Sequence, residues 1–130
     1  ATYMGMRLRE QLGSDYLAVG FVLGEGTYRA WIKPNEPVIA DVTVGPREPG
    51  WVAEAFAQAG PPNFAIDLRT VTTGRARGWL FSPQILHSCG WLVSELERKG
   101  TVAVLGKLFD VAIYLDRTSS ARQLPRAETR

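Results

Sequence analysis

The sequence predicts an α/β fold: a mixed sheet with flanking helices and an antiparallel hairpin. Helix-like and strand-like segments alternate along the chain. Residues 16–23 (YLAVGFVL) are apolar at almost every position, which is typical of a strand covered on both faces. Residues 27–33 and 38–44 alternate apolar and polar side chains around a turn at 34–37, which predicts a hairpin with one solvated face. The length of 130 residues allows a single segment with one modest core.

The first element is predicted to be a short helix. Met4, Leu8 and Leu12 recur at a spacing of four with charged residues between them, so they share one helical face. Gly13 is a natural end for such a helix.

The glycines at 20, 24 and 26 raise the question of a phosphate-binding loop. Such a loop needs to run directly into a helix whose N-terminus faces the phosphate, whereas these glycines run into a strand-like segment. The lysine and hydroxyl of a nucleotide-binding loop are also missing. Gly24 and Gly26 are therefore interpreted as a bend or bulge between two strands.

The rest of the chain continues the alternation. We expect a loop at 45–50, a helix at 51–59 that ends at Gly60, a strand within 61–70 and a loop at 72–78. Residues 79–96, interrupted by Pro83, fit either a strand or a helix. Strands are expected within 101–106 and 111–116, and a flexible tail at 118–130. Val52, Ala55, Phe56 and Ala59 would share the apolar face of the helix, and Phe64, Ile66 and Leu68 one side of the strand.

Composition excludes several classes of function. A net charge of +2, with arginines spread singly along the chain, argues against nucleic acid or a membrane surface as partner. No apolar run approaches the roughly 20 residues that span a bilayer. The single cysteine, Cys89, excludes an internal disulfide and fits a reducing compartment, so we expect a cytoplasmic protein. The start at Ala1, without a methionine, indicates a piece of something longer.

Glu25 is the first candidate site residue, because it follows a buried strand, where clefts form in α/β sheets. It either faces such a cleft or is a solvated turn residue. Asp67 and Arg69 are expected to form a structural ion pair on one strand face.

His87, Ser88 and Cys89 stand together in LHSCG and look like a nucleophile set. Adjacency in sequence is poor support for catalysis, since a base needs an orienting partner, so a structural histidine is favoured. One histidine and one cysteine are too few for a typical zinc site.

Several motifs in order resemble the erythromycin esterase family. They are Met4-Gly5, Leu8-Arg9-Glu10, Leu12-Gly13, Asp15-Tyr16, Gly20-Phe21, Gly24, Gly26, Arg29-Ala30, Asp67-Leu68-Arg69, Trp79-Leu80, Ser88 with Gly90, and the closing LFDVAIYLDRTSSAR. The resemblance runs from about Tyr3 to about Leu124. Two positions depart from the family pattern: Leu23 replaces a phenylalanine, and His87 stands where a basic residue precedes Ser88.

The resemblance implies the C-terminal portion of a larger α/β hydrolase-type domain, whose partner is the N-terminal half of the same protein. The family's catalytic histidines and glutamates lie upstream, so no catalytic residue is assigned here. Such enzymes resemble macrolide esterases: a histidine activates a water that opens a cyclic ester, without a covalent intermediate, cofactor or obligatory metal. Phe21, Glu25 and Tyr28 would wall the cleft that binds the small-molecule ester.

Three readings of function remain open. The chain is a hydrolase portion that is active only with its N-terminal half, a ligand-binding or interaction module without catalysis, or a small complete enzyme that uses His87 with Ser88 or Cys89. The first is favoured.

Overall fold

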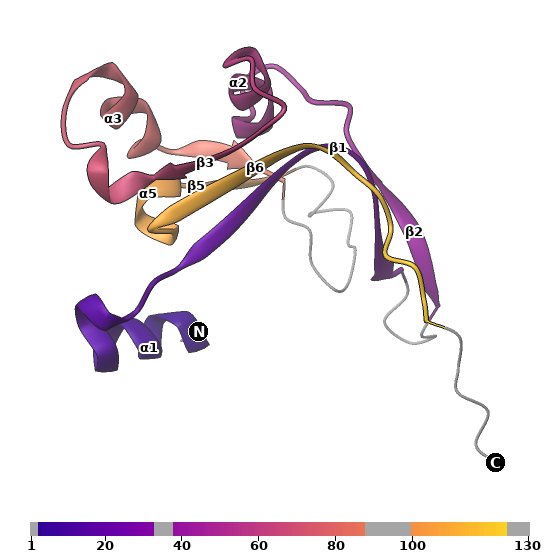
Figure 1. Cartoon of the computed structure of the whole chain (residues 1–130), viewed down its shortest axis with the longest axis horizontal. Helices are drawn as coiled ribbons and strands as arrows, with labels where there is room; N and C mark the ends of the chain where they lie inside the picture. The colour runs from indigo at the N-terminus through magenta and orange to yellow at the C-terminus, as the bar shows by residue number, and fades with distance from the viewer. Residues whose placement is uncertain (1–2, 33–37, 88–99, 125–130) are drawn as a thin grey trace.

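A four-stranded mixed sheet forms the centre of the computed structural model, which describes residues 3–32, 38–87 and 100–124 (Figure 1). Its strand order is β2-β1-β6-β3, and a two-stranded sheet pairs β4 with β5. The strands are β1 (Val19–Trp31), β2 (Ile39–Val44), β3 (Asn63–Asp67), β4 (Gln84–Leu86), β5 (Thr101–Ala103) and β6 (Val111–Thr118). The central strands β1 and β6 are parallel, and the outer strands run antiparallel to them. The predicted mixed α/β class is confirmed.

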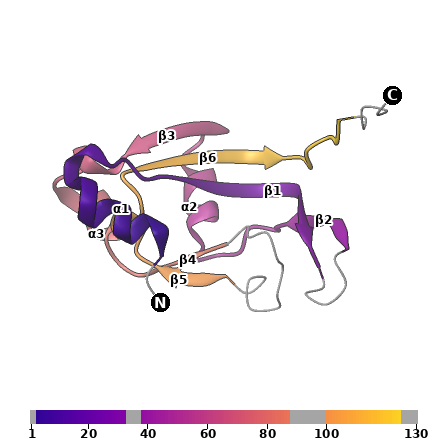
Figure 2. The ribbon, with the colours of Figure 1, turned by 90° about the horizontal axis from the view of Figure 1, so that it is seen from below.

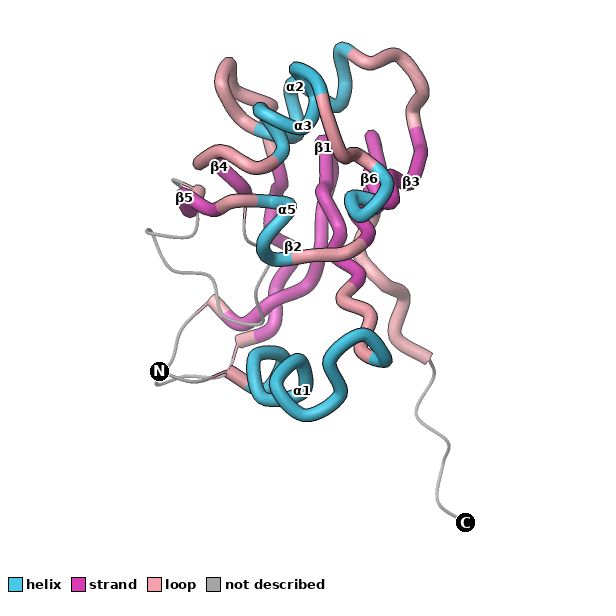
Figure 3. Tube along the Cα trace, turned by 90° about the vertical axis from the view of Figure 1, so that its left-hand side faces the viewer, coloured by secondary structure: helices cyan, strands magenta, loops and turns pink. Residues whose placement is uncertain are grey.

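Helices lie on both sides of the sheet but cover them unequally. They are α1 (Met4–Leu12), α2 (Val52–Gln58), α3 (Gly74–Leu80) and α5 (Leu105–Leu108), with short 3-10 turns η1 (Gly13–Asp15) and η2 (Leu68–Thr70). Helices α2 and α3 lie over one face, whereas α1 lies apart on the other side (Figures 1 and 3). No helix within the described ranges is long and apolar enough to cross a membrane.

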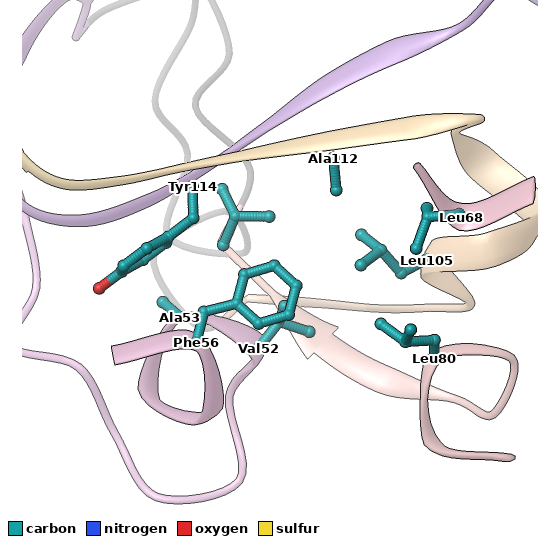
Figure 4. Packing of buried hydrophobic residues seen from close by; sticks show 9 residues of the cluster. Val52, Ala53, Phe56, Leu68, Leu80, Leu105, Ala112 and Tyr114 are labelled. Atoms are coloured by element: carbon teal, nitrogen blue, oxygen red, sulfur yellow. The ribbon is translucent and has the colours of Figure 1, made fainter. Parts of the chain in front are cut away.

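The core lies between the sheet and α2. Val52, Ala53 and Phe56 are buried on one face of α2, at the spacing of an amphipathic helix. The ring of Phe56 meets the ring of Tyr114 edge-on, with 5.8 Å between centroids (Figure 4). The other members of this cluster are Val22, Leu68, Leu80, Leu105 and Ala112.

Strand register separates the sheet into two faces. Val22 is aligned with Tyr114, and Phe64 with Tyr114, so these side chains belong to the face that packs on α2. The opposite side of β1, β6 and β3, which we call the open face, carries Val19, Phe21, Leu23, Ala65, Val111, Ile113 and Leu115. Figure 2 shows this side of the three strands with α2 behind them.

The glycine-rich stretch lies within one strand, not between two as predicted. β6 pairs with β1 as far as Gly26, and β2 pairs with it from Gly26 onward, so the partners change while the strand continues. Gly24 leaves room for the backbone of Asp116 and the hydroxyl of Tyr114, which a Cβ would strike. Gly26 has φ of +134°, in the region that favours glycine. These glycines allow close strand approach and the bend of β1 seen in Figure 1.

Two further predictions differ from the structure. The expected loop at 72–78 contains most of α3, which ends in the buried Leu80. The strand expected within 101–106 stops at Ala103, and α5 follows because Leu105 turns into the core. Buried leucines thus stabilise both short helices against weak local preference.

Other predicted elements are confirmed. Helix α1 covers the expected residues and ends at Gly13, whose φ is +53°. β1 and β2 pair from Gly26 opposite Val44 to Trp31 opposite Ile39, which is the expected hairpin. Its turn at 34–37 lies outside the described residues, as do Ser88, Cys89 and the second half of the ambiguous stretch 79–96. Residues 119–124 have no regular structure, although the Ser120 backbone N–H donates to Thr27.

Candidate functional site

A charged cluster lies where β1 and β6 part, at the carboxyl end of the parallel pair. It consists of Glu25, Arg47, Glu54, Tyr114, Asp116 and Arg117. Arg47 comes from the loop between β2 and α2 and is only 19% exposed. Its Nη1 donates to Asp116 Oδ1 and, over 3.3 Å, to the Tyr114 hydroxyl. The edge of a sheet at this end is where α/β proteins place ligand clefts.

The Arg47 guanidinium connects three elements. Nη2 lies 3.5 Å from Glu25 Oε1 on β1, and Nε lies 3.8 Å from Glu54 Oε2 on α2. Asp116 adds β6 to the same contact set. One loop arginine therefore holds the bend of the sheet against the helix.

The pKa shifts in the cluster favour fixed charges over proton transfer. A hydrogen bond from Tyr114, aided by the charge of Arg47, lowers the pKa of Asp116 despite its partial burial. Burial, and then the hydrogen bond to Asp116, raise the pKa of Tyr114. Burial opposes the charge of Arg47, but its partners outweigh burial and raise its pKa. These pKa values move away from neutrality, so the three groups suit positioning and hydrogen bonding better than acid–base catalysis near pH 7.

Glu25 is held by two cations at the position where the sequence predicted a site residue. Besides its contact with Arg47, its Oε2 lies 3.4 Å from Arg117 Nη1. The Glu25 side chain is 28% exposed. It is thus a partly accessible carboxylate with a fixed orientation.

Phe21 lines an apolar cavity of about 440 Å³ at the edge of β1. The residue is 61% exposed. The cavity is bounded by Gly20, Phe21, Leu23, Leu86, His87, Thr101, Ala103, Leu108 and Phe109. The β4–β5 hairpin therefore forms one wall, and β1 forms the other.

His87 and Trp51 stack beside a second, more polar cavity of about 480 Å³. Their ring centroids are 5.9 Å apart with an interplanar angle of 23°. This cavity also exposes Asp41, Thr43 and Glu48, and the Asp41 carboxylate accepts a 3.1 Å hydrogen bond from Arg29. Because His87 lines both cavities, it stands between an apolar and a polar compartment.

The three predicted cleft residues occupy different places along β1. Phe21 lines the apolar cavity, Glu25 belongs to the charged cluster, and Tyr28 lies beyond the bend, opposite Val42 of β2. Neither Glu25 nor Tyr28 lines either of the two cavities described above.

Sequence reasoning missed Arg47, Tyr114 and Asp116. Tyr114 and Asp116 are two positions apart in a strand-like run, and this spacing could have placed them on one face. Arg47 lies 67 residues from Tyr114 along the chain, and nothing local in its loop marks that contact.

The expected pair of Asp67 and Arg69 is confirmed, with Arg69 Nη2 2.7 Å from Asp67 Oδ2. Among residues 3–32, 38–87 and 100–124, no group of three histidine, cysteine or acidic side chains is arranged to hold a metal ion. The acids of the charged cluster instead surround the arginines.

Comparison with known families decides the relationship of the chain. The family model described as erythromycin esterase matches residues 1–118. The chain belongs to the erythromycin esterase family. This membership confirms the resemblance drawn from the sequence motifs.

Two solved structures share the fold of this erythromycin esterase family chain. A protein from Bacillus cereus is 24% identical, with a TM-score of 0.76 and coverage of 88% of this chain and 28% of its own. A succinoglycan biosynthesis protein is 21% identical, with a TM-score of 0.75 and coverage of 90% and 28%. The chain therefore spans 28% of the length of each solved protein. No curated protein matches it significantly.

Proposed function

We propose that the chain is the C-terminal portion of a carboxylic ester hydrolase and supplies scaffold and pocket wall. The observation that carries this proposal is the family match over residues 1–118. The catalytic histidine and glutamate would lie upstream, in the N-terminal part of an α/β hydrolase-type domain. The chain covers 28% of each solved protein, so most of a protein of that length would lie outside it and could include such a part.

The reaction proposed for the complete enzyme is the opening of a cyclic or other ester by water. An upstream histidine held by a carboxylate would remove a proton from that water as it attacks the ester carbonyl. The acyl–oxygen bond then breaks, and the leaving oxygen takes the proton back from the histidine to become an alcohol, so no covalent enzyme intermediate or cofactor is needed. With a macrolide as substrate, this hydrolysis would inactivate an antibiotic in the cytoplasm and give resistance.

The pocket wall is assigned to Phe21, Glu25 and Tyr28. Phe21 offers an exposed ring beside the apolar cavity, which suits the hydrocarbon part of an ester. Glu25 offers a carboxylate that Arg47 and Arg117 already orient, so it can accept a hydrogen bond from substrate at little entropic cost. Tyr28 would extend the wall beyond the bend.

The test of the wall is Glu25→Gln in the complete enzyme. Loss of a charged acceptor should raise KM for the ester about tenfold with little change in kcat, because this contact is made to bound substrate throughout the reaction. Glu10→Gln on the exposed face of α1 is the matched control and should leave KM unchanged. An unchanged KM in a folded Glu25→Gln enzyme would remove Glu25 from the wall.

The alternative is a non-catalytic ligand-binding or interaction module of the same fold. The two cavities of about 480 and 440 Å³ favour it, because they lie within this chain and need no other segment to form. A complete protein that binds an ester in equilibrium dialysis but never releases acid and alcohol would support this alternative.

A further inference from the structure

The open face of the sheet is apolar across three strands. Register places Val19 beside Val111, Phe21 beside Ile113 and Leu23 beside Leu115 on the parallel pair. Ala65 of β3 extends the same face, opposite Ile113. By the same register, charged side chains stand at the two ends of this surface, with Asp67 at one end and Glu25 beside Arg117 at the other.

Burial differs sharply between the two faces. On the face under α2, Val22, Ala112 and Tyr114 are buried. On the open face, Val19 is 44% exposed and Phe21 61% exposed, and Ala65 is exposed too. A parallel pair of strands normally has helices on both faces, and a contiguous exposed apolar surface of this kind marks an interaction site.

Helix α1 lies on this side of the sheet but does not cover it. A bidentate contact from Arg9 fastens the helix to Asp110, just before β6. No residue of α1 is buried, and Met4, Met6 and Leu12 are themselves exposed. Figure 2 shows α1 in front of only the beginning of β1.

We propose that the open face, except for Phe21 and Leu23 at its edge, which line the apolar cavity, is the docking surface for helices of the polypeptide that precedes these residues in the complete enzyme, an inference that rests on the proposed function. The same backbone unit occurs in two solved chains of which it makes up 28%, so most of each chain lies outside it. Strands add to sheet edges, whereas helices with an apolar stripe cover sheet faces. A covalently joined segment also has a high effective concentration at the face, which favours it over a second copy of the chain.

Thiol labelling measures whether the face is covered. In a Cys89→Ala background, Val19→Cys and Ala65→Cys place probes on two strands of the open face. Ile39→Cys on β2, where the native residue is 51% exposed, is the matched control outside this face. Each variant is labelled with a small maleimide in two forms: the 130-residue chain, and the complete polypeptide encoded by the same gene.

We expect rapid labelling at all three positions in the 130-residue chain. In the complete polypeptide, labelling at Val19→Cys and Ala65→Cys should slow by at least about tenfold, since a packed helix must open first. Labelling at Ile39→Cys should not change. Circular dichroism confirms that each variant is folded.

Three results would overturn the proposal. The first is rapid labelling at both open-face probes in the complete polypeptide, and the second is equal slowing at Ile39→Cys. The third is protection in the short chain that grows with its concentration, which would assign the face to a second copy. Labelling does not depend on turnover, so the two proposals can fail separately. Protection of the open-face probes without esterase activity would refute only the proposed function. Esterase activity without protection of these probes would refute only the docking surface.

Discussion

At the residue scale, the feature that organises the candidate site is Arg47. Its guanidinium faces Asp116, Glu25 and Glu54, which belong to three different elements. The side chain is 19% exposed, so its charge is better shielded from water than that of a surface arginine. Removing it would leave three carboxylates close together, with Arg117 as the remaining cation of the cluster.

Replacing Arg47 with methionine keeps much of the side-chain volume and removes the charge. We expect the free energy of unfolding to fall by about 2–3 kcal/mol, because partly buried carboxylates lose their partner. Urea denaturation measures this change. Arg29→Met is the matched control: its pair with Asp41 is well exposed on both sides, so the loss should stay below about 1 kcal/mol. Equal losses in the two variants would contradict a structural role for the cluster.

At the scale of elements, the sequence predicted the first helix, the hairpin and the strands, because their patterns are local. The prediction that residues 16–23 are covered on both faces was wrong, since Val19 and Phe21 are exposed. The sequence did not predict that β1 continues through Gly24 and Gly26. This continuity depends on pairing with β6 before the bend and with β2 after it. The sequence also missed α3, whose two glycines lower helix propensity. Contacts with distant segments stabilise α3 despite its low helix propensity, because Leu80 packs in the core cluster.

The candidate site was likewise predicted only in part from the sequence. Glu25 was predicted because an apolar run ends just before it in the sequence, although the strand itself continues through this position. Arg47 was not, since its partners lie on elements that meet only in the folded chain.

The attachment of α1 to β6 predicts a dependence of stability on pH. The hydrogen bonds from Arg9, and one from the Ala18 backbone N–H, lower the pKa of Asp110 below its ordinary value of 3.8 despite its burial. A carboxylate with a lowered folded-state pKa contributes stability above its unfolded pKa and loses it as the pH falls through the folded pKa. The chain should therefore lose stability as the pH drops below about 4.

Asp110→Asn tests this dependence. The variant lacks the charged contact with Arg9, so its free energy of unfolding at pH 7 should be lower than that of the native chain. Because asparagine does not titrate, its free energy of unfolding should also fall less steeply toward pH 3. Urea denaturation at a series of pH values measures both slopes. Parallel curves for the two proteins would show that the Arg9–Asp110 contact does not contribute.

At the scale of the whole molecule, the two sheet faces are both mainly apolar but differ in what covers them. One face is packed on α2 and the buried cluster, and the other presents Val19, Phe21 and Ala65 to solvent. The apolar cavity and a fixed carboxylate adjoin strand β1, and the polar cavity lies along β2. This arrangement fits a wall that another part of the complete polypeptide completes.

The most direct test is ester hydrolysis by the purified 130-residue chain, compared with the complete polypeptide from the same gene at equal molar concentration. The release of acid from a macrolide and from a simple activated ester would be followed in parallel. We expect turnover by the complete polypeptide and only the uncatalysed rate with the short chain. Turnover by the short chain at an enzymatic rate, abolished by His87→Ala, would contradict this expectation.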